Sequence, residues 1–561
     1  MMTGKTACAW TRRDFLTWAA AGAGAIPWSV ARGAPAAAAA VPGRRPNFLV
    51  IVGDDMGFSD AGCYGGEIAT PHLDALAAGG IRFTQVYSTG RCWPSRACIL
   101  TGHYAQQVRM DPPKGRLPAW TRLAPHYLKP LGYRCYHSGK WHIHGAPKAV
   151  ADGGFDRSYL LADQDRFFSP RRHWEDDRPL PPVSPGTGYY ATTAIADHAV
   201  RCLQGHARDH RNRPFFQYLA FTSPHFPLHA LQDDIARYRG RYTQGWDSVR
   251  QARWKRMRKM GIVNCDLSPL QPDVKPGWNL PEDTLQERIG PGEAGRAVPW
   301  DTLSEAQKTL QATKMAIHAA MIDRMDREIG RVLDQLKTMG AHENTVILFV
   351  SDNGASAEQI IRGDKHDPSA PPGSWRSYLC LGPGWSTAAN TPFRLHKSWV
   401  HEGGIASPLI VHWPAGLAAR GELRHNPGHF VDLLPTVLEL AGARASPTWK
   451  GKPTPPLAGR SLAPALAKDG TVSHDFLFFH HGGNRAIRIG DWKLVSAGRR
   501  GPWELYNLAT DRCESRNLAA AHPDKARDLS GAWQRHETQF RQMAASDEWR
   551  ESAEASGDPA R

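Results

Sequence analysis

Metal-binding cysteine spacings are absent from this sequence. Its 561 residues include nine cysteines, and no two of them stand in a Cys-x-x-Cys pattern. This excludes the common structural zinc sites that are built from cysteine pairs. The cysteines are also too scattered to form the framework of a small disulfide-rich fold. One or two disulfides stay open as a prediction, and the sequence does not indicate which cysteines would pair.

A hydrophobic run long enough to cross a membrane is also missing. The most apolar stretch, Phe15–Val30, is interrupted by glycine and proline and is short for a spanning helix. A lipid anchor would need a cysteine just after this run, whereas the nearby Cys8 precedes it. We therefore expect no stable membrane anchor.

Acidic residues are in the minority, and the formal net charge is +15. Nucleic acid binding is one explanation, but the sequence has neither a nucleic-acid recognition motif nor a tail rich in lysine and arginine. An anionic substrate or an anionic polymer is a simpler explanation. The sequence also has 20 tryptophans, and aromatic rings beside cations suit a carbohydrate or aryl ligand. We predict that nucleic acid is not a partner.

Residues 1–40 are typical of an export signal rather than of a folded domain. Arg12 and Arg13 precede the weakly apolar run and an alanine-rich tract, a pattern that resembles twin-arginine signals. Cargo of this pathway crosses the membrane already folded. The pattern therefore predicts a bacterial protein that is periplasmic or secreted.

The remaining chain exceeds one typical core, so we expect two domains. The larger, residues 46–465, ends after a linker rich in proline and glycine. The smaller, residues 466–546, contains four short runs that predict an antiparallel sheet, followed by a helix from about Pro523. Residues 547–561 are small and polar and are predicted to be disordered.

Short continuous apolar runs indicate the fold class of the larger domain. The runs at 47–52, 215–221 and 346–350 read as strands buried on both faces, with helical patterns between them. Met315–Met339 is one such helix, with methionines assigned to the core. The basic segment Arg250–Lys259 is interpreted as a solvated helix face. Together these patterns predict an α/β fold with a large, mostly parallel sheet between helices.

Acidic and amide side chains follow two of the predicted strands. Asp54 and Asp55 end the first strand, and Asp352 and Asn353 end the strand at 346–350. Open α/β sheets bind their ligands at the carboxyl ends of strands, so we expect the two pairs to meet. An all-oxygen ligand set favours Ca²⁺, or alternatively Mg²⁺, over zinc.

The segment Cys92-Trp93-Pro94-Ser95-Arg96 is a second candidate site. We expect Pro94 at the first position of a helix, which places Cys92 at or just before the helix N-terminus, where anions are favoured. Arg96 follows Cys92 by one helical turn and can reach the same place. Most free cysteines are buried and structural, but these polar, cationic surroundings argue against that role here.

Three further segments display candidate residues after predicted strands or in loops. Lys140 and His142 follow the strand near 132–137, and alternate spacing would aim both to one face if the segment is extended. His225 lies in a proline-rich loop after the strand at 215–221. Lys397 follows a long loop rich in glycine, proline and serine.

In their order along the chain, these motifs resemble the type I sulfatases of the alkaline phosphatase superfamily. The resemblance covers roughly residues 47–517 and implies a large catalytic domain with an alkaline-phosphatase-like sheet and a small C-terminal α+β domain. It implies that Cys92 is oxidised to Cα-formylglycine by a maturation enzyme. It also implies that Asp54, Asp55, Asp352 and Asn353, together with the modified Cys92, bind a divalent metal ion, Ca²⁺ or Mg²⁺.

The resemblance further implies a mechanism for sulfate ester hydrolysis. The hydrated formylglycine at position 92 attacks sulfur, while the metal ion and Lys397 hold the sulfate oxygens. Arg96 and Lys140 stabilise the modified side chain and its charge. His225 protonates the departing alcohol oxygen, and His142 accepts a proton from the remaining hydroxyl so that sulfate is expelled.

Two alternatives stay open at the level of sequence. A phosphonate or phosphodiester hydrolase of the same superfamily can use the same nucleophile and metal pocket. A non-catalytic binder of sulfated glycans would result if Cys92 were never converted. Sulfated polysaccharides and small aryl sulfates are both compatible with the positive charge, and exo or endo action is not specified.

Overall fold

The computed structural model describes residues 45–112, 114–362 and 365–549. The predicted export signal and most of the predicted disordered tail lie outside these residues. Within them, no helix has the length and apolar character that crossing a membrane requires.

An 11-stranded mixed sheet is the centre of the described chain. Its strand order is β10-β2-β9-β8-β1-β7-β3-β4-β5-β6, and β11 pairs with β2. The strands are β1 (Asn47–Gly53), β2 (Ile81–Tyr87), β3 (Arg134–Lys140), β4 (Arg157–Leu161), β5 (His173–Glu175), β6 (Arg178–Pro179), β7 (Phe215–Ala220), β8 (Thr345–Ser351), β9 (Ala406–His412), β10 (Glu422–Arg424) and β11 (Gly428–His429). The central strands β8, β1, β7, β3 and β4 run parallel, whereas β9 is antiparallel to both neighbours. The predicted mostly parallel sheet is confirmed.

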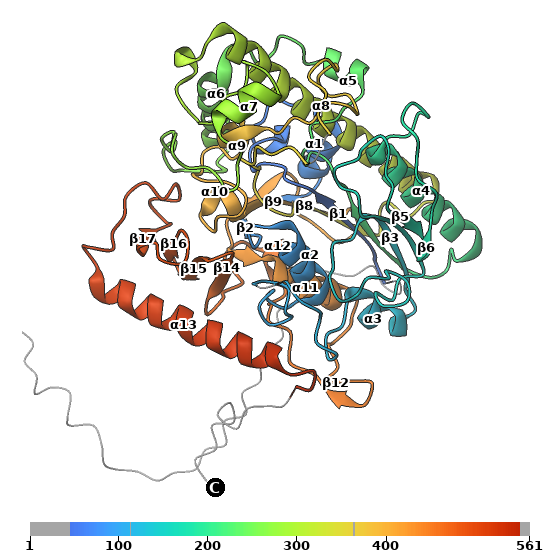
Figure 1. Ribbon diagram of the computed structural model, residues 1–561. Helices are drawn as coiled ribbons and strands as arrows, with labels where there is room; N and C mark the ends of the chain where they lie inside the picture. Colours follow the sequence, from blue (N-terminus) through green and yellow to red (C-terminus); the bar gives the residue numbers. More distant parts are fainter. Residues whose placement is uncertain (1–44, 113, 363–364, 550–561) are drawn as a thin grey trace, which may run out of the picture. The chain divides into compact units, whose positions relative to one another are not determined.

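Helices cover both faces of this sheet (Figure 1). They are α1 (Pro71–Ala78), α2 (Cys92–Thr101), α3 (Ala124–Leu128), α4 (Ala191–Asp209), α5 (Gln232–Ala236), α6 (Gly245–Lys259), α7 (Glu282–Arg288), α8 (Glu305–Thr338), α9 (Gly382–Ala389), α10 (Glu402–Ile405), α11 (Leu433–Leu440) and α12 (Ala463–Ala467). Successive β1 residues point to opposite faces. Leu49 and Ile51 pack in the core with α4 and α8, while Val50 and Val52 pack with α2 and α11.

The long helix α8 begins ten residues before the predicted start at Met315. Its first turn is closed by a capping box, in which the Ser304 hydroxyl accepts from the Gln307 N–H and the Gln307 side chain accepts from the Ser304 N–H. The methionines assigned to the core, Met315, Met321 and Met325, are fully buried.

The interpretation of Arg250–Lys259 as a solvated face is wrong in part. The segment does form α6, but Arg253 is completely buried. Its guanidinium lies 2.7 Å from Oδ1 of Asp60 and 2.8 Å from Oε2 of Glu67. These acids come from the loop after β1, so a distant segment of the chain compensates the buried charge.

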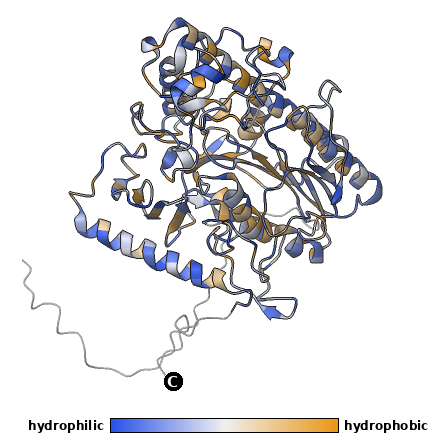
Figure 2. Ribbon diagram, viewed as in Figure 1, coloured by the Kyte–Doolittle hydropathy of each residue, from blue (hydrophilic) through white to orange (hydrophobic). Residues whose placement is uncertain are grey.

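A small antiparallel sheet follows in the C-terminal part, in agreement with the prediction. It contains β14 (Leu477–His481), β15 (Asn484–Ile489), β16 (Trp492–Ser496) and β17 (Glu504–Asn507), and helix α13 (Pro523–Ala545) packs on it. In Figure 2, α13 is mostly hydrophilic with hydrophobic residues at intervals. Trp533 and Phe540 of α13 are buried, and Trp533 stacks on Phe478 of β14. The predicted linker contains a hairpin of β12 (Thr448–Trp449) and β13 (Lys452–Pro453).

Candidate active site

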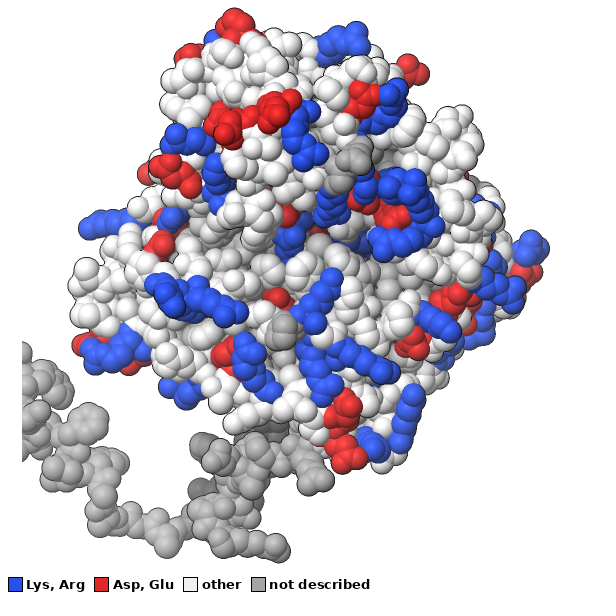
Figure 3. All heavy atoms as spheres, viewed as in Figure 1, with Lys and Arg blue, Asp and Glu red and all other residues white. Residues whose placement is uncertain are grey.

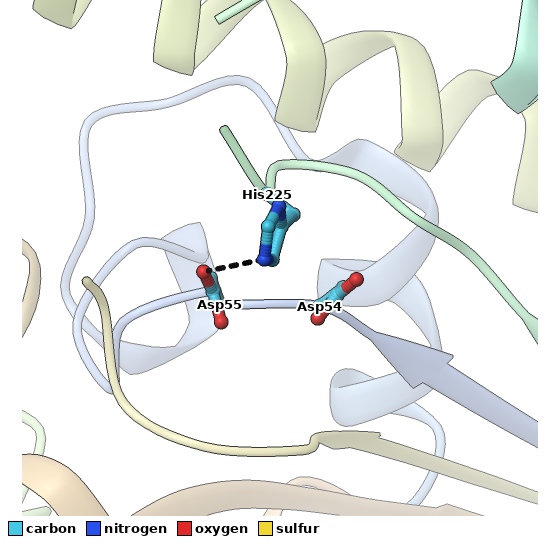
Figure 4. Close-up of side chains that lie close together, drawn as sticks. All are labelled: Asp54, Asp55 and His225. Carbon is cyan, nitrogen blue, oxygen red and sulfur yellow. Dashed lines mark ion pairs between the residues drawn. The ribbon is translucent and has the colours of Figure 1, made fainter. Parts of the chain in front are cut away.

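The two acidic strand ends meet, as the sequence predicts. β1 and β8 are parallel neighbours whose last paired residues are Gly53 and Ser351, so Asp54 and Asp352 leave the sheet side by side. Carboxylate oxygens of Asp54 and Asp352 and the sulfur of Cys92 all lie within 4.8 Å of one another. The same holds for ligand atoms of Asp54, Asp55 and His225 (Figure 4).

The backbone conformation of Asp55 directs its carboxylate into the same pocket as that of Asp54. Asp55 has a φ of 67°, in the left-handed region where aspartate is one of the tolerated residues. Its N–H lies 3.3 Å from Oδ1 of Asp352. The turn therefore presents Asp54 and Asp55 to one pocket, which an extended strand would not do.

Cys92 is the first residue of α2 and is 2% exposed. The helix begins two residues earlier than expected, so Pro94 occupies its third position, where the absent N–H is still without cost. Arg91 is the extended N-cap. The Ser95 hydroxyl accepts from the Thr89 N–H at 3.1 Å and fixes the approach of the chain to the helix. Cys92 thus faces the pocket from a helix N-terminus.

Arg96 and Lys140 are held against the carboxylates. The Arg96 Nε donates to Asp352 Oδ2 at 2.8 Å, and Lys140 Nζ lies 2.6 Å from Asp54 Oδ2. Burial alone would lower the pKa of Arg96, but Asp352 and the other nearby groups raise it above its ordinary value. Burial and the neighbouring Asp352 raise the pKa of Asp54, while Lys140 opposes this shift. The charges in the pocket are therefore strongly interdependent.

Lys397 pairs with the second carboxylate, Asp55. Its Nζ lies 2.7 Å from Asp55 Oδ1 and 3.6 Å from Glu358 Oε2. Glu358 also pairs with Arg91 at 3.2 Å and accepts from the Trp278 indole N–H at 2.9 Å. Burial would raise the pKa of Glu358, but Lys397 and Arg91 lower it below its ordinary value. Sequence reasoning missed Glu358 and Arg91 as members of the site.

His225 enters from the loop after β7. Its Nδ1 lies 2.5 Å from the Phe226 carbonyl oxygen, which can only accept, so Nδ1 carries the hydrogen. The other nitrogen, Nε2, faces Asp55 Oδ2 at 3.7 Å (Figure 4). Burial and the positive charge of Lys397 lower the pKa of His225 well below its ordinary value. The ring is therefore neutral and presents a lone pair to the pocket.

His142 stands apart from this cluster. β3 ends at Lys140, and His142 has a φ of 59°, so the alternation expected of an extended segment stops there. Its ring lies 5.8 Å from Trp93 and 5.5 Å from His144, and its Nδ1 has no hydrogen-bond partner among the described residues. His142 and Lys140 both line the cleft, and Lys140 in addition contacts the cluster through Asp54.

The oxygen atoms of this pocket fit a hard divalent cation. Asp54 Oδ1 and Asn353 Oδ1 are buried and have no hydrogen-bond partner among the described residues. The Asn353 amide nitrogen donates to Asp55 Oδ1 at 2.7 Å, which orients its oxygen away from that carboxylate. Unpaired buried oxygens are costly unless a further partner is present, and carboxylate and amide oxygens are the ligands of Ca²⁺ and Mg²⁺.

A cleft of about 1680 Å³ adjoins this pocket at Lys140, which is one of the residues that line it. Nine basic and four acidic residues are among those that line it, so its net charge is positive. The basic residues are Lys114, Arg116, Lys140, Lys148, Arg166, Arg171, Arg172, Arg362 and Lys365. Figure 3 shows lysine and arginine side chains gathered around hollows in the surface. Such a cleft attracts anions.

Comparisons with known proteins agree with this geometry. An uncharacterized sulfatase of Schizosaccharomyces pombe is 30% identical over 555 residues, which cover 90% of this chain and 96% of that protein. An arylsulfatase of Klebsiella aerogenes is 31% identical over 456 residues, covering 75% and 91% respectively. The crystal structure of Ps i-CgsB with k-i-k-neocarrahexaose superposes with a TM-score of 0.63 at 21% identity, covering 91% of this chain and 96% of that one. Residues 46–443 match the protein family described as Sulfatase. The chain therefore belongs to the sulfatases, which are sulfuric ester hydrolases.

Proposed function

We propose that this sulfatase cleaves its substrates with Cα-formylglycine derived from Cys92 and a divalent cation, Ca²⁺ or Mg²⁺. The observation that carries the proposal is the position of Cys92, at a helix N-terminus within 4.8 Å of oxygens from both Asp54 and Asp352. A structural cysteine would pack among apolar side chains rather than among buried carboxylates and cations.

The cation would be held by Asp54, Asp55, Asp352 and Asn353, together with the modified residue 92. When bound, it withdraws electron density from the sulfate group and offsets developing negative charge. The hydrated aldehyde supplies a hydroxyl nucleophile at position 92, which a thiol does not. The cation matches the buried oxygens of the pocket, two of which lack a hydrogen-bond partner among the described residues.

The chain's own cations hold the sulfate and stabilise negative charge. Lys397 and Lys140 are fixed by carboxylates at 2.7 and 2.6 Å, so their ammonium groups need no reorganisation when substrate arrives. Arg96 lies deeper and fixes Asp352 and the Lys140 carbonyl, at 2.8 and 3.1 Å. We therefore assign Lys397 to the sulfate, and Arg96 and Lys140 to the modified side chain at position 92 and its charge.

We assign to His225 the transfer of a proton to the leaving alcohol oxygen. The ring is neutral because burial and Lys397 lower its pKa. The negative charge of a bound sulfate ester beside Nε2 would raise that pKa and load the ring with the proton that the alcohol needs. His142, at the cleft wall, is assigned the later proton transfer that releases sulfate.

The substrate class follows from the cleft. The cleft is wider than the sulfate pocket and its charged lining is mostly basic, which suits a ligand that carries sulfate groups on an extended sugar. We therefore propose a sulfated carbohydrate, with aryl sulfates as convenient probes. The bound neocarrahexaose in the Ps i-CgsB structure supports this choice. We further propose export by the twin-arginine route to the periplasm or beyond, a maturation enzyme acting on Cys92, and a catalytic domain bounded by residues 46 and 465.

Mass spectrometry and turnover test the proposal together. Protein from the native host should show an aldehyde oxygen in place of the thiol at residue 92 and should release sulfate from p-nitrocatechol sulfate. The Cys92→Ala variant should bind Ca²⁺ more weakly and lose turnover. The control variant Cys202→Ser, which alters a cysteine beside His198, should retain turnover.

An unmodified thiol at residue 92 in active protein would refute the proposed formylglycine nucleophile. Faster release of phosphonate than of sulfate would favour a phosphonate or phosphodiester hydrolase. Binding of sulfated glycans without turnover would favour a non-catalytic binder.

A further inference from the structure

Two cysteines from distant parts of the chain lie in contact. Cys265 follows α6 in the large domain, and Cys513 follows β17 of the small sheet, 248 residues later. Their sulfur atoms are 2.8 Å apart, which is closer than two sulfur atoms pack when no bond joins them. Both residues are buried, with 4% and 1% exposure. The pair is not part of the Cys92 site.

The chain segments on both sides of the contact are fixed. The Trp254 indole N–H donates to the Cys265 carbonyl oxygen at 2.9 Å, and the Cys513 sulfur lies 2.6 Å from the Asp266 carbonyl oxygen. Beyond Cys513, the Glu514 carboxylate accepts from the Glu402 N–H at 2.8 Å. Because the backbones already hold the two sulfurs together, a bond between them requires no large movement.

The surroundings also favour the chemistry. The hydrogen bond from Cys513 lowers the pKa of Cys265, and the cationic Arg512 acts in the same direction. A thiolate is the form that attacks a disulfide. By contrast, Cys202 faces His198, at 3.7 Å, rather than another cysteine, and Cys380 contacts the Ile360 carbonyl, at 3.5 Å.

We propose that Cys265 and Cys513 form a disulfide that joins the small C-terminal sheet to the large domain. A thiolate of one cysteine attacks a disulfide oxidant such as oxidised glutathione, and the second cysteine then displaces the bound thiol. Two protons and two electrons leave the protein, one sulfur–sulfur bond forms, and the oxidant is reduced to two thiols. Because both sulfurs are buried, local opening of the loop around Cys513 precedes the exchange.

The bond would stabilise the docking of the small sheet. It closes a loop of about 250 residues, and cross-links of long loops remove much of the freedom of the unfolded chain. Cys513 also lies between Arg512 and Glu514, which both contact Glu402. The disulfide would therefore also fix Glu402, which follows Lys397 in the chain, together with the C-terminal sheet.

Peptide mapping of full-length protein tests the proposal. The purified protein is incubated with oxidised glutathione, alkylated without reductant and digested. The expected product is a pair of peptides linked through Cys265 and Cys513, two hydrogen atoms lighter than their sum, which separates on reduction. Recovery of both cysteines fully alkylated would overturn the proposal, whatever the result at Cys92.

Thermal unfolding supplies a second readout with matched controls. Reduction should lower the Tm of the oxidised protein by roughly 2–5 °C, given the effect of one disulfide on a chain of this length. Cys265→Ser and Cys513→Ser should abolish this sensitivity to reductant, whereas Cys202→Ser and Cys380→Ser should retain it. Equal sensitivity in all four variants would contradict the assignment. If a serine variant at either position does not fold, the peptide map of the unaltered protein decides alone.

Discussion

The ammonium group of Lys493, on β16 of the small sheet, lies 2.9 Å from Oε1 of Glu402, the first residue of α10. Both side chains are buried, and the same ammonium lies 2.8 Å from Glu514. Glu402 in turn follows Lys397 by five residues. The small sheet is therefore tied by buried charges to the segment that supplies a cation to the active site.

Replacing Lys493 by methionine should destabilise the protein strongly. The change keeps the length of the side chain but leaves Glu402 and Glu514 buried without this cation, a loss that typically costs about 3–5 kcal/mol. Urea unfolding followed by fluorescence measures it as a lower midpoint. The exposed Lys468→Ala change should stay within about 0.5 kcal/mol of the parent protein. Equal midpoints for the two variants would show that the buried pair contributes little.

Calcium should raise the stability of the folded protein. A ligand that binds only the folded state at 100 times its Kd adds about 2.7 kcal/mol, which appears as a higher Tm. Asp54→Asn removes one carboxylate from the proposed site and should largely abolish the shift. Asp334→Asn, which alters an exposed carboxylate on α8, should keep it. A Ca²⁺ effect of equal size in both variants would place the ion elsewhere.

Acid should destabilise the protein through histidines that are buried in neutral form. Burial lowers the pKa of His103 to about 4 and that of His429 to about 3. Below pH 6.5 the unfolded state binds a proton at each position while the folded state does not, so stability falls as the pH falls from about 6.5 to about 4. Each such histidine contributes a slope of about 1.4 kcal/mol per pH unit.

Urea unfolding between pH 7.5 and 5 checks this slope. His429→Asn retains an acceptor for the Val431 N–H, which His429 Nδ1 accepts at 3.2 Å, but cannot be protonated in this range. The variant should show a shallower dependence on pH, whatever its absolute stability. An unchanged slope would mean that His429 does not titrate on unfolding.

His481 should position Trp93, which contacts the cleft residues His142 and Lys114. Its Nδ1 contacts Asp111 Oδ2 at 2.7 Å, and its ring lies 5.5 Å from that of Trp93, the residue after Cys92. His481→Ala should lower kcat/KM by about five-fold, corresponding to about 1 kcal/mol of lost aromatic contact, mainly through KM. His481→Asn, which can still donate to Asp111, should recover part of the loss. A loss confined to kcat would indicate a direct part in the chemistry.

The central features of the site could be predicted because short apolar strands end in chemically distinctive residues. Asp54 and Asp352 follow strands whose composition marks them as buried and parallel, and parallel strands deliver their ends to one edge. The Cys92 segment carried its own helix signal in Pro94, although the helix begins two residues earlier. Four antiparallel strands in the C-terminal part were predicted from four short strand-like runs.

Long-range pairing explains what could not be predicted. Arg253 lies in a basic run that is typical of a solvated helix, and only the fold brings Glu67, 186 residues earlier in the chain, to its guanidinium. Glu358 stands in a loop without periodicity, so nothing local separates it from a surface acid. His142 was expected to share a face with Lys140, but the strand ends between them and the backbone turns.

The ion pair between Asp55 and Lys397 joins residues 342 positions apart, and this separation sets an order of events during synthesis. At roughly 5–20 residues per second, Lys397 leaves the ribosome about 17–70 s after Asp55. During that interval the growing chain holds the first acidic strand end and Cys92 without their later cationic partner. The pocket is complete only once Lys397 has been synthesised, and Lys493, which ties Glu402 to the small sheet, is synthesised later still.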